Sequence, residues 1–85
     1  EVSSLLRALA HPGRLLILGY LLERPKTVSE LQELSELSQS QLSQFLGRMK
    51  MEGLVSAERS GKFITYSVAD PRIAELIASL QKIFC

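Results

Sequence analysis

Residues 37–55 read LSQSQLSQFLGRMKMEGLV, and this stretch decides the fold. Its apolar side chains recur at the i, i+3, i+4, i+7 spacing of one packed helical face: Leu42, Phe45, Leu46 and Met49. The opposite face carries small and amide side chains: Gln39, Ser40, Ser43, Gln44, Gly47 and Arg48. A merely solvated face would favour Glu, Lys and Ala, which have higher helix propensity. The sequence therefore predicts a packed helix whose outer face has a separate task.

Local end signals make this helix the second member of a helix-turn-helix. The capping box Ser38-Gln-Ser-Gln41 starts it, and Gly53 supplies the left-handed residue that stops it. An earlier capping box, Thr27-Val-Ser-Glu30, starts a shorter helix just before it. We expect that shorter helix to have an inner face of three residues, Val28, Leu31 and Leu34. Leu37 fills the tight turn between them, so residues 27–53 are predicted to form a helix-turn-helix.

Two further helices are predicted ahead of this unit. The first ten residues place apolar side chains at helical spacing: Val2, Leu5, Leu6 and Leu9. His11-Pro12-Gly13 interrupts that helix, because proline lacks an amide hydrogen and disfavours helix in the residue before it. Pro12 suits the first turn of a second helix over about residues 12–23. This helix is apolar nearly all round, so we expect it to be the central buried one.

Residues 54–68 change from helical to alternating spacing and predict a hairpin wing. Apolar and polar residues alternate on both sides of the turn signal Ser60-Gly61. Before the turn the alternating residues are Val55, Ala57 and Arg59, and after it they are Ile64, Tyr66 and Val68. Tyr66 is expected to pack its ring on the core.

Asp70-Pro71 opens a last helix with one long apolar side, made of Ile73, Leu76, Ile77, Leu80 and Phe84. The element order is then helix-helix-helix-helix-strand-strand-helix. This is the order of a winged helix-turn-helix, a mainly α fold with a two-stranded β-hairpin wing.

Composition is consistent with one folded domain over residues 1–85. The hydrophobic fraction of 46% is that of a globular protein, and no apolar run reaches the roughly 18 residues of a membrane span. A single cysteine excludes an internal disulfide framework and fits a reducing, cytoplasmic compartment. Residues 1–37 carry 4 positive and 5 negative side chains, whereas residues 38–62 carry 4 and 2. The weak basic bias therefore coincides with the helix of interest and the wing.

The polar face of that helix is predicted to bind double-stranded DNA. Gln can make paired hydrogen bonds to adenine and Arg to guanine in the major groove, and small residues allow a close approach. The helix N-terminus adds amides and a partial positive charge that attract phosphate. Predicted contacts are Gln39, Ser40, Gln41, Ser43, Gln44 and Arg48 on a recognition helix over residues 38–52, with Arg59 and Lys62 on the wing. The wing cations are expected to touch phosphate.

The segments LLRALAHPGRLLILGYLLE, TVSELQELSELSQSQLSQFLGRMKMEGLV and FITYSV resemble the ArsR/SmtB family of bacterial winged-helix repressors. The resemblance covers essentially the whole chain, and the Phe84-Cys85 ending is similar to that of the HlyU, BigR and YgaV branch. It implies a homodimer held by the first and last helices and bound to a palindromic operator. Each protomer would place its recognition helix in the major groove and its wing beside the adjacent backbone.

This chain departs from the ligand pattern of the family's metal sensors. Those sensors carry thiolates before the recognition helix or Asp, His and Glu on the last helix. Residues 28–37 contain no Cys or His, and the last helix offers only Asp70, Glu75 and Cys85. Tight transition-metal binding needs three or four converging soft or imidazole ligands. We therefore expect no metal and no cofactor.

A second departure concerns redox sensing. The resembling branch typically senses oxidants or reactive sulfur through two cysteines, and the position that matches the first is Gly19 here. A dithiol switch within one protomer is therefore not expected, and sensing by Cys85 alone is kept as an alternative. Close packing of a neighbouring backbone or aromatic ring is the simplest reason for Gly19. Phe45 stands where the branch usually has His, so it packs inward or touches a thymine methyl.

Two other function classes fit the sequence less well than DNA binding. A winged helix that only binds proteins often has acidic or apolar residues on its second helix, which the Gln, Ser and Arg here do not match. Catalysis lacks a nucleophile–base–orienter set and a phosphate-cradling glycine loop. His11, the only histidine, is interpreted as a structural residue at a helix junction.

Overall fold

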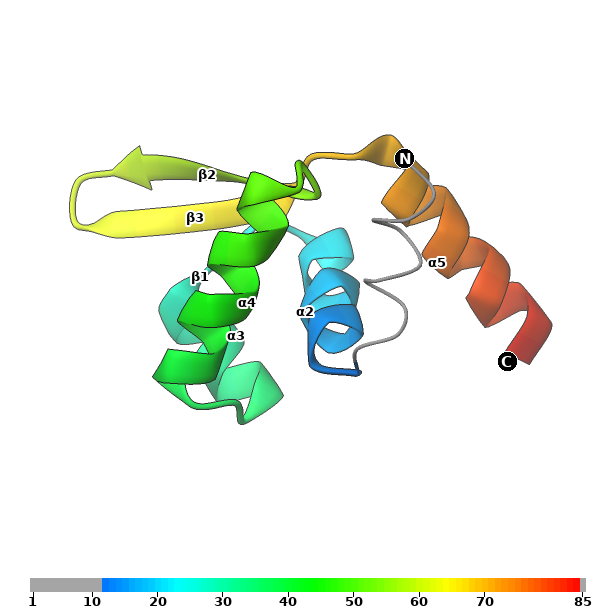
Figure 1. The fold of residues 1–85 in the computed structure, drawn as a ribbon, viewed down its shortest axis with the longest axis horizontal. Coiled ribbons are helices and arrows are strands. Elements are labelled where there is room, and N and C mark those ends of the chain that lie inside the picture. Colours follow the sequence, from blue (N-terminus) through cyan, green and yellow to red (C-terminus); the bar gives the residue numbers. More distant parts are fainter. Residues whose placement is uncertain (1–11, 85) are drawn as a thin grey trace.

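The computed structural model describes residues 12–84, in which helices pack beside a small sheet (Figure 1). The elements in chain order are α2 (Pro12–Glu23), β1 (Lys26–Thr27), α3 (Val28–Ser35), α4 (Gln39–Met51), β2 (Val55–Ser60), β3 (Phe63–Val68) and α5 (Pro71–Phe84). The helix predicted over residues 1–10, with Val2, Leu5, Leu6 and Leu9, lies outside the described residues. The described order confirms the predicted winged helix-turn-helix.

The described part of the chain is elongated, with principal extents of 39 × 24 × 21 Å. Figure 1 shows the β2–β3 hairpin projecting from one end and α5 from the other, with α2, α3 and α4 between them. The helix-turn-helix therefore lies in the middle of the molecule, flanked by the wing.

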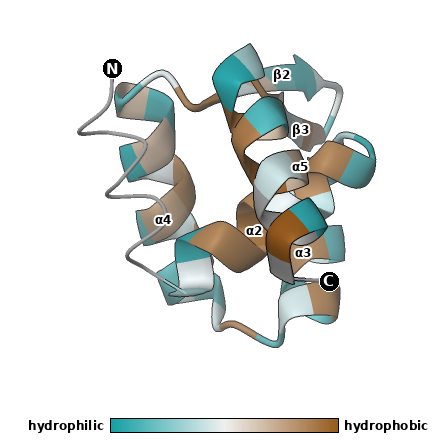
Figure 2. Ribbon diagram, turned by 90° about the vertical axis from the view of Figure 1, so that its right-hand side faces the viewer, coloured by the Kyte–Doolittle hydropathy of each residue, from teal (hydrophilic) through white to brown (hydrophobic). Residues whose placement is uncertain are grey.

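Helix α2 lies at the centre of the core, as predicted, and is largely coloured as hydrophobic in Figure 2. Ile17, Leu18 and Leu21 are at most 3% exposed. Two positions differ from a simple apolar core helix, because Leu16 is 42% exposed whereas the charged Arg14 is only 4% exposed. The core cluster of the described residues is Ile17, Leu18, Leu21, Leu31, Leu42, Leu46, Met49, Leu54, Val55, Ile73 and Ile77.

Helix α3 begins with the predicted capping box. The hydroxyl of Thr27 accepts the amide of Glu30 at 3.2 Å, and the Glu30 carboxylate accepts the amide of Thr27 at 2.9 Å. Leu31 is fully buried, but Leu34 is 43% exposed, so the predicted inner face is wrong at Leu34. Leu34 lies in the last turn of a helix of only 8 residues, where the chain already leaves for the turn.

The turn between α3 and α4 uses a left-handed residue that the sequence did not indicate. Glu36 caps α3 with φ 60°, a conformation usually taken by Gly or Asn. Leu37 follows and packs, partly buried, against the core, as expected for the residue that fills the turn.

Helix α4 has the predicted cap at each end. The Ser38 hydroxyl accepts the Gln41 amide at 3.1 Å, and the Gln41 side-chain oxygen accepts the Ser38 amide at 3.1 Å. At the other end Gly53 has φ 79°. The Leu54 amide donates to Met49 O at 2.9 Å and the Gly53 amide to Lys50 O at 3.1 Å, which together form a Schellman motif.

The sheet has three antiparallel strands in the order β1-β3-β2, whereas the sequence predicted two. The addition is the short β1, where Lys26 pairs with Tyr66 and Thr27 with Thr65. Lys26 is 2% exposed, and its ammonium donates to Tyr20 O at 3.0 Å. A lysine in a two-residue strand gives no alternating apolar signal, so sequence periodicity could not detect it.

The wing turn contains two residues, Gly61 and Lys62, between the paired Ser60 and Phe63. Gly61 has φ 60°, whereas Lys62 is not among the residues with positive φ. Glycine at the first of two loop positions is the preference of type II′ hairpins, whose twist matches that of the strands. The predicted turn is confirmed, one residue further along than Ser60-Gly61.

Asp70 precedes helix α5 and caps it by binding Arg72, the second residue of the helix. Its carboxylate accepts the Arg72 amide at 3.0 Å and the Arg72 guanidinium at 2.7 Å. These bonds, the guanidinium bond foremost, lower the pKa of Asp70 to about 2. Ile73 and Ile77 are buried on the side that the sequence predicted, which attaches α5 to the core.

The α3 cap should make part of the stability dependent on pH. The hydrogen bond from Arg24, followed by that from the Thr27 amide, lowers the pKa of Glu30 from 4.5 to about 2. The native pKa lies below the unfolded one, so this stabilisation is present above about pH 4.5 and is lost as the pH falls toward 2. Glu30→Gln keeps an acceptor for the cap but does not titrate. Denaturant unfolding at pH 6 and pH 3 should show a smaller loss of unfolding free energy in this variant than in the wild type.

Glu33→Gln is the matched control, since it removes an exposed carboxylate from the same helix without touching the cap. It should keep the wild-type difference between the two pH values. Equal pH dependence in Glu30→Gln and the wild type would contradict the assignment.

Candidate nucleic-acid interface

The outer face of α4 is exposed along its whole length. Leu42, Leu46 and Met49 hold the other side of the helix in the core at no more than 1% exposure. This one-sided burial leaves a stripe of polar and small residues in solvent: Gln39, Ser40, Ser43, Gln44, Gly47 and Arg48. All of these residues were predicted to face outward, and the structure brings them together on one surface.

The side chains in the middle of this surface are small and project only a short distance from the helix. Ser40, Ser43 and Gly47 lie at positions i, i+3 and i+7, so they form one strip along the helix. A Cβ added to Gly47 would meet no atom within 4 Å, so packing within the described chain does not require the glycine. A missing side chain on an exposed helical face is suited to the close approach of another surface.

The N-terminal end of the stripe offers both amides and amide side chains. Helix α4 starts at Gln39 after the cap residue Ser38, so its first amides and its positive dipole end lie beside Gln39 and Ser40. Gln41, also predicted to contact DNA, uses its side-chain oxygen to accept the Ser38 amide and so has a structural task as well. An anion such as phosphate is favoured at this end.

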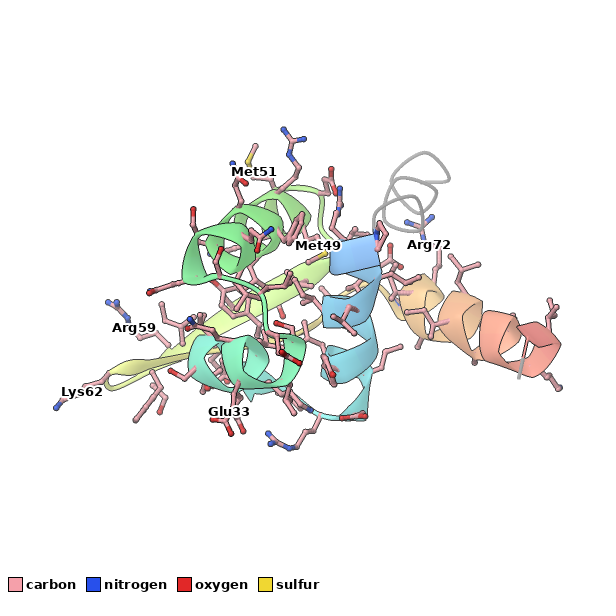
Figure 3. All side chains as sticks on the ribbon, turned by 90° about the horizontal axis from the view of Figure 1, so that it is seen from below. Glu33, Met49, Met51, Arg59, Lys62 and Arg72 are labelled. Atoms are coloured by element: carbon pink, nitrogen blue, oxygen red, sulfur yellow. The ribbon has the colours of Figure 1, made fainter. Side chains whose placement is uncertain are left out.

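The C-terminal half of the stripe borders a hollow of about 430 Å³ lined by Gln44, Arg48, Met51 and Glu52. Met51 is 89% exposed, and Figure 3 shows it pointing away from the core. Sequence reasoning did not assign Met51 to this face. Its place on this face could have been predicted, because Met51 follows Gln44 by seven residues, or two helical turns, and so lies on the same side of the helix.

The wing carries its cations at the tip. Arg59 and Lys62 are both exposed, and Figure 3 shows their side chains reaching away from the body of the molecule. Phe63, next to the turn, is 61% exposed. A smaller hollow of about 180 Å³ separates this part of the wing from the start of α3, with Thr27 and Ser29 on one wall and Lys62 and Phe63 on the other.

Phe45 packs inward rather than outward. A Cβ at Gly13 would lie 2.7 Å from Cε2 and 3.0 Å from Cζ of Phe45, so the ring lies against the backbone of the first turn of α2. This resolves the two alternatives for Phe45 in favour of packing. It also gives Gly13 a reason, because any larger residue would displace the ring.

At Gly19, no contact with the described residues requires a glycine. A Cβ there would meet nothing within 4 Å, so the expectation of close packing at Gly19 is wrong for this part of the chain. Glycine in the middle of α2 therefore weakens the helix without a packing gain among residues 12–84. His11 and Cys85 lie outside the described residues.

Residues 12–84 contain no group of three or more His, Cys, Asp or Glu side chains that could hold a metal ion. Within the same residues, no helix combines the length and the apolar character that crossing a membrane requires.

Residues 11–57 match one family model, described as bacterial regulatory protein, arsR family. This span is more than half of the chain and contains the complete helix-turn-helix. The chain belongs to the ArsR family. It is a DNA-binding transcriptional regulator of the ArsR type, as the sequence resemblance implied.

Several ArsR-type relatives match almost the whole chain. The HTH-type transcriptional regulator YgaV of Escherichia coli K12 is 40% identical over 86 residues, which cover 100% of this chain and 87% of the relative. The biofilm growth-associated repressor of Agrobacterium fabrum is 40% identical and covers 100% and 73%. The transcriptional activator HlyU of Vibrio cholerae is 36% identical and covers 95% and 75%.

Solved structures agree with the ArsR assignment. The transcriptional repressor BigR from Xylella fastidiosa superposes with a TM-score of 0.93 at 37% identity, covering 99% of this chain and 86% of that one. The homodimeric winged helix-turn-helix DNA-binding domain Mb0332 from Mycobacterium bovis gives a TM-score of 0.85 at 30% identity, covering 96% and 76%. The predicted similarity to the HlyU, BigR and YgaV branch is thereby confirmed.

Replacement of Gln44 should test the exposed face of α4. An amide on this face is suited to a bidentate contact with adenine, so Gln44→Ala should weaken operator binding by about 1–3 kcal/mol and relax the preference at one base position. The measurement is a set of binding constants for operator duplexes with single base changes. Gln32→Ala, an exposed glutamine on α3, is the matched control and should keep the base preference. Unchanged affinity and preference in Gln44→Ala would remove Gln44 from the reading face.

Neutralising the wing cations should change the salt dependence of binding instead. A phosphate contact releases counterions whatever the sequence, so Arg59→Ala or Lys62→Ala should each flatten the slope of log K against log salt by about 1. Lys82→Ala removes an exposed lysine from α5, at the opposite end of the molecule, and should leave the slope unchanged. Wild-type slopes in both wing variants would show that the wing tip does not contact DNA.

Proposed function

We propose that this chain represses transcription as a homodimer bound to a palindromic operator. Helix α4 enters the major groove of each half-site, and the β2–β3 wing lies against the adjacent backbone. The observation that carries the proposal is the exposed stripe of amide, hydroxyl and guanidinium groups on the second helix of a helix-turn-helix. The relatives from Agrobacterium fabrum and Xylella fastidiosa are named repressors, which supports this direction of regulation, whereas HlyU is named an activator.

The proposed contacts divide by chemistry. The amides and hydroxyls near the start of α4 read base edges: Gln39, Ser40, Gln41, Ser43 and Gln44. The cations bind phosphate: Arg48, Arg59 and Lys62. Helix α4 contains no acidic residue, so nothing within it repels the DNA backbone. This composition also favours DNA over a protein partner as the ligand of the face.

The proposed dimer uses the first and last helices. On the described part of the chain, Leu16 of α2 is 42% exposed and Ile83 of α5 is 71% exposed, so apolar surface remains near these helices. A two-fold partner would bury it, and the homodimeric winged-helix relative supports this assembly. The protein would act in the cytoplasm as a binding protein and not as an enzyme, without a cofactor.

Selection from a pool of random duplexes tests the proposal. The purified protein should enrich an inverted repeat whose half-site centres lie about one DNA turn apart, roughly 34 Å, because the two recognition helices of a symmetric dimer have that spacing. Sedimentation of the complex should give two chains per operator, and the free protein should be dimeric at micromolar concentration.

An enriched sequence without two-fold symmetry, or a chain that remains monomeric both free and on DNA, would contradict the dimer. Absence of any enriched sequence, with binding equal on all duplexes, would contradict sequence-specific regulation.

A further inference from the structure

The first turn of α2 touches the recognition helix at two points. Gly13 receives the ring of Phe45, and the guanidinium of Arg14 donates from Nη2 to the Oε1 of Glu52 in an ion pair. Phe45 and Glu52 are seven residues apart, so they lie on nearly the same side of α4, separated by about 10 Å along its axis. Figure 1 shows α2 and α4 side by side.

The ion pair is partly buried, and its burial makes it a poor device for stability alone. The side chains of Arg14 and Glu52 are 5% and 14% exposed. The Nε of Arg14 is buried without a hydrogen-bond partner, which is unfavourable. Well-packed apolar side chains often replace a buried ion pair without loss of stability. Compared with apolar side chains, an ion pair holds the two helices in a more narrowly defined orientation, because its strength depends on the geometry of the two charged groups.

The position of Glu52 also requires a partner. Glu52 is the C-cap of α4, where the negative end of the helix dipole disfavours a carboxylate. The cation that compensates for it comes from α2, 38 residues earlier in the chain. The pair therefore fixes the end of α4 to the most buried helix of the core.

We infer that Gly13 and Arg14 of α2, with Phe45 of α4 and the C-cap residue Glu52, are positioning residues that set the orientation of the recognition helix for base reading. Burial of Leu42, Leu46 and Met49 fixes which side of α4 faces solvent. The two attachments to α2, about 10 Å apart along the axis, add resistance to a change of tilt. Helix α4 has 13 residues, so a tilt of about 10° around its Glu52 end moves the Gln39 end by roughly 3 Å. A displacement of that size breaks hydrogen bonds, whose lengths vary by only about 0.5 Å.

The inference rests on the proposed DNA binding, and it separates specific from non-specific affinity. Binding to scrambled DNA depends on phosphate charge and tolerates a tilted helix, whereas base contacts do not. A purely structural role would lower both affinities together, through the folded fraction. A positioning role lowers the ratio between them.

The test compares binding to the selected operator and to a scrambled duplex of the same length at one salt concentration. The double variant Arg14→Met/Glu52→Met removes both charges, so no lone charge is buried, and it should unfold at or above the wild-type midpoint. Its operator-to-scrambled affinity ratio should fall at least tenfold. Gly13→Ala forces the Phe45 ring to move and should also lower this ratio. If the double variant does not fold, Gly13→Ala alone tests the positioning role.

Ile73→Val is the control, because Ile73 is 1% exposed in α5 and its truncation loosens the core without touching these contacts. It should lower stability and keep the ratio. A wild-type ratio in both Gly13→Ala and the folded double variant overturns the positioning role while leaving DNA binding intact. A wild-type protein that prefers no sequence overturns the proposed function itself, and the positioning role with it.

Discussion

One-sided burial of α4 is the constraint on which the rest of the molecule depends. Leu42, Leu46 and Met49 have no freedom to rotate out of the core, since together they expose almost no surface. The opposite side of a helix held in this way must face solvent, whatever residues stand there. The same apolar contacts that fold the protein therefore determine which groups meet a ligand, so folding and recognition share one set of interactions.

The ends of α4 matter as much as its side. The reciprocal bonds of Ser38 and Gln41 define where the helix begins, and the Schellman bonds at Gly53 define where it ends. A shift of the start by one residue would rotate the exposed stripe by about 100° relative to the first free amides. Capping therefore sets the residue at which α4 begins, and with it the side chains that lie beside the positive end of the helix.

The sequence predicted what depends on neighbours along the chain. Both capping boxes, the Gly53 stop and the Asp70-Pro71 start are local signals, and the structure confirms each. Contacts between distant residues were not predictable in this way. The Arg14–Glu52 pair joins residues 38 apart, and β1 exists only because its two residues meet β3. Exposure of Leu34 likewise follows from where the chain turns, which helical periodicity does not encode.

The third strand makes the wing stiff at one end and loose at the other. β1 pairs with Thr65 and Tyr66 only, so β3 is flanked on both sides near the core but has β2 alone beside it at Phe63 and Ile64. Backbone amides near the tip should therefore exchange with solvent hydrogen faster than those at the base. On the proposed operator, such a gradient would let the wing cations adjust to a backbone whose groove width varies with sequence, while the recognition helix stays fixed.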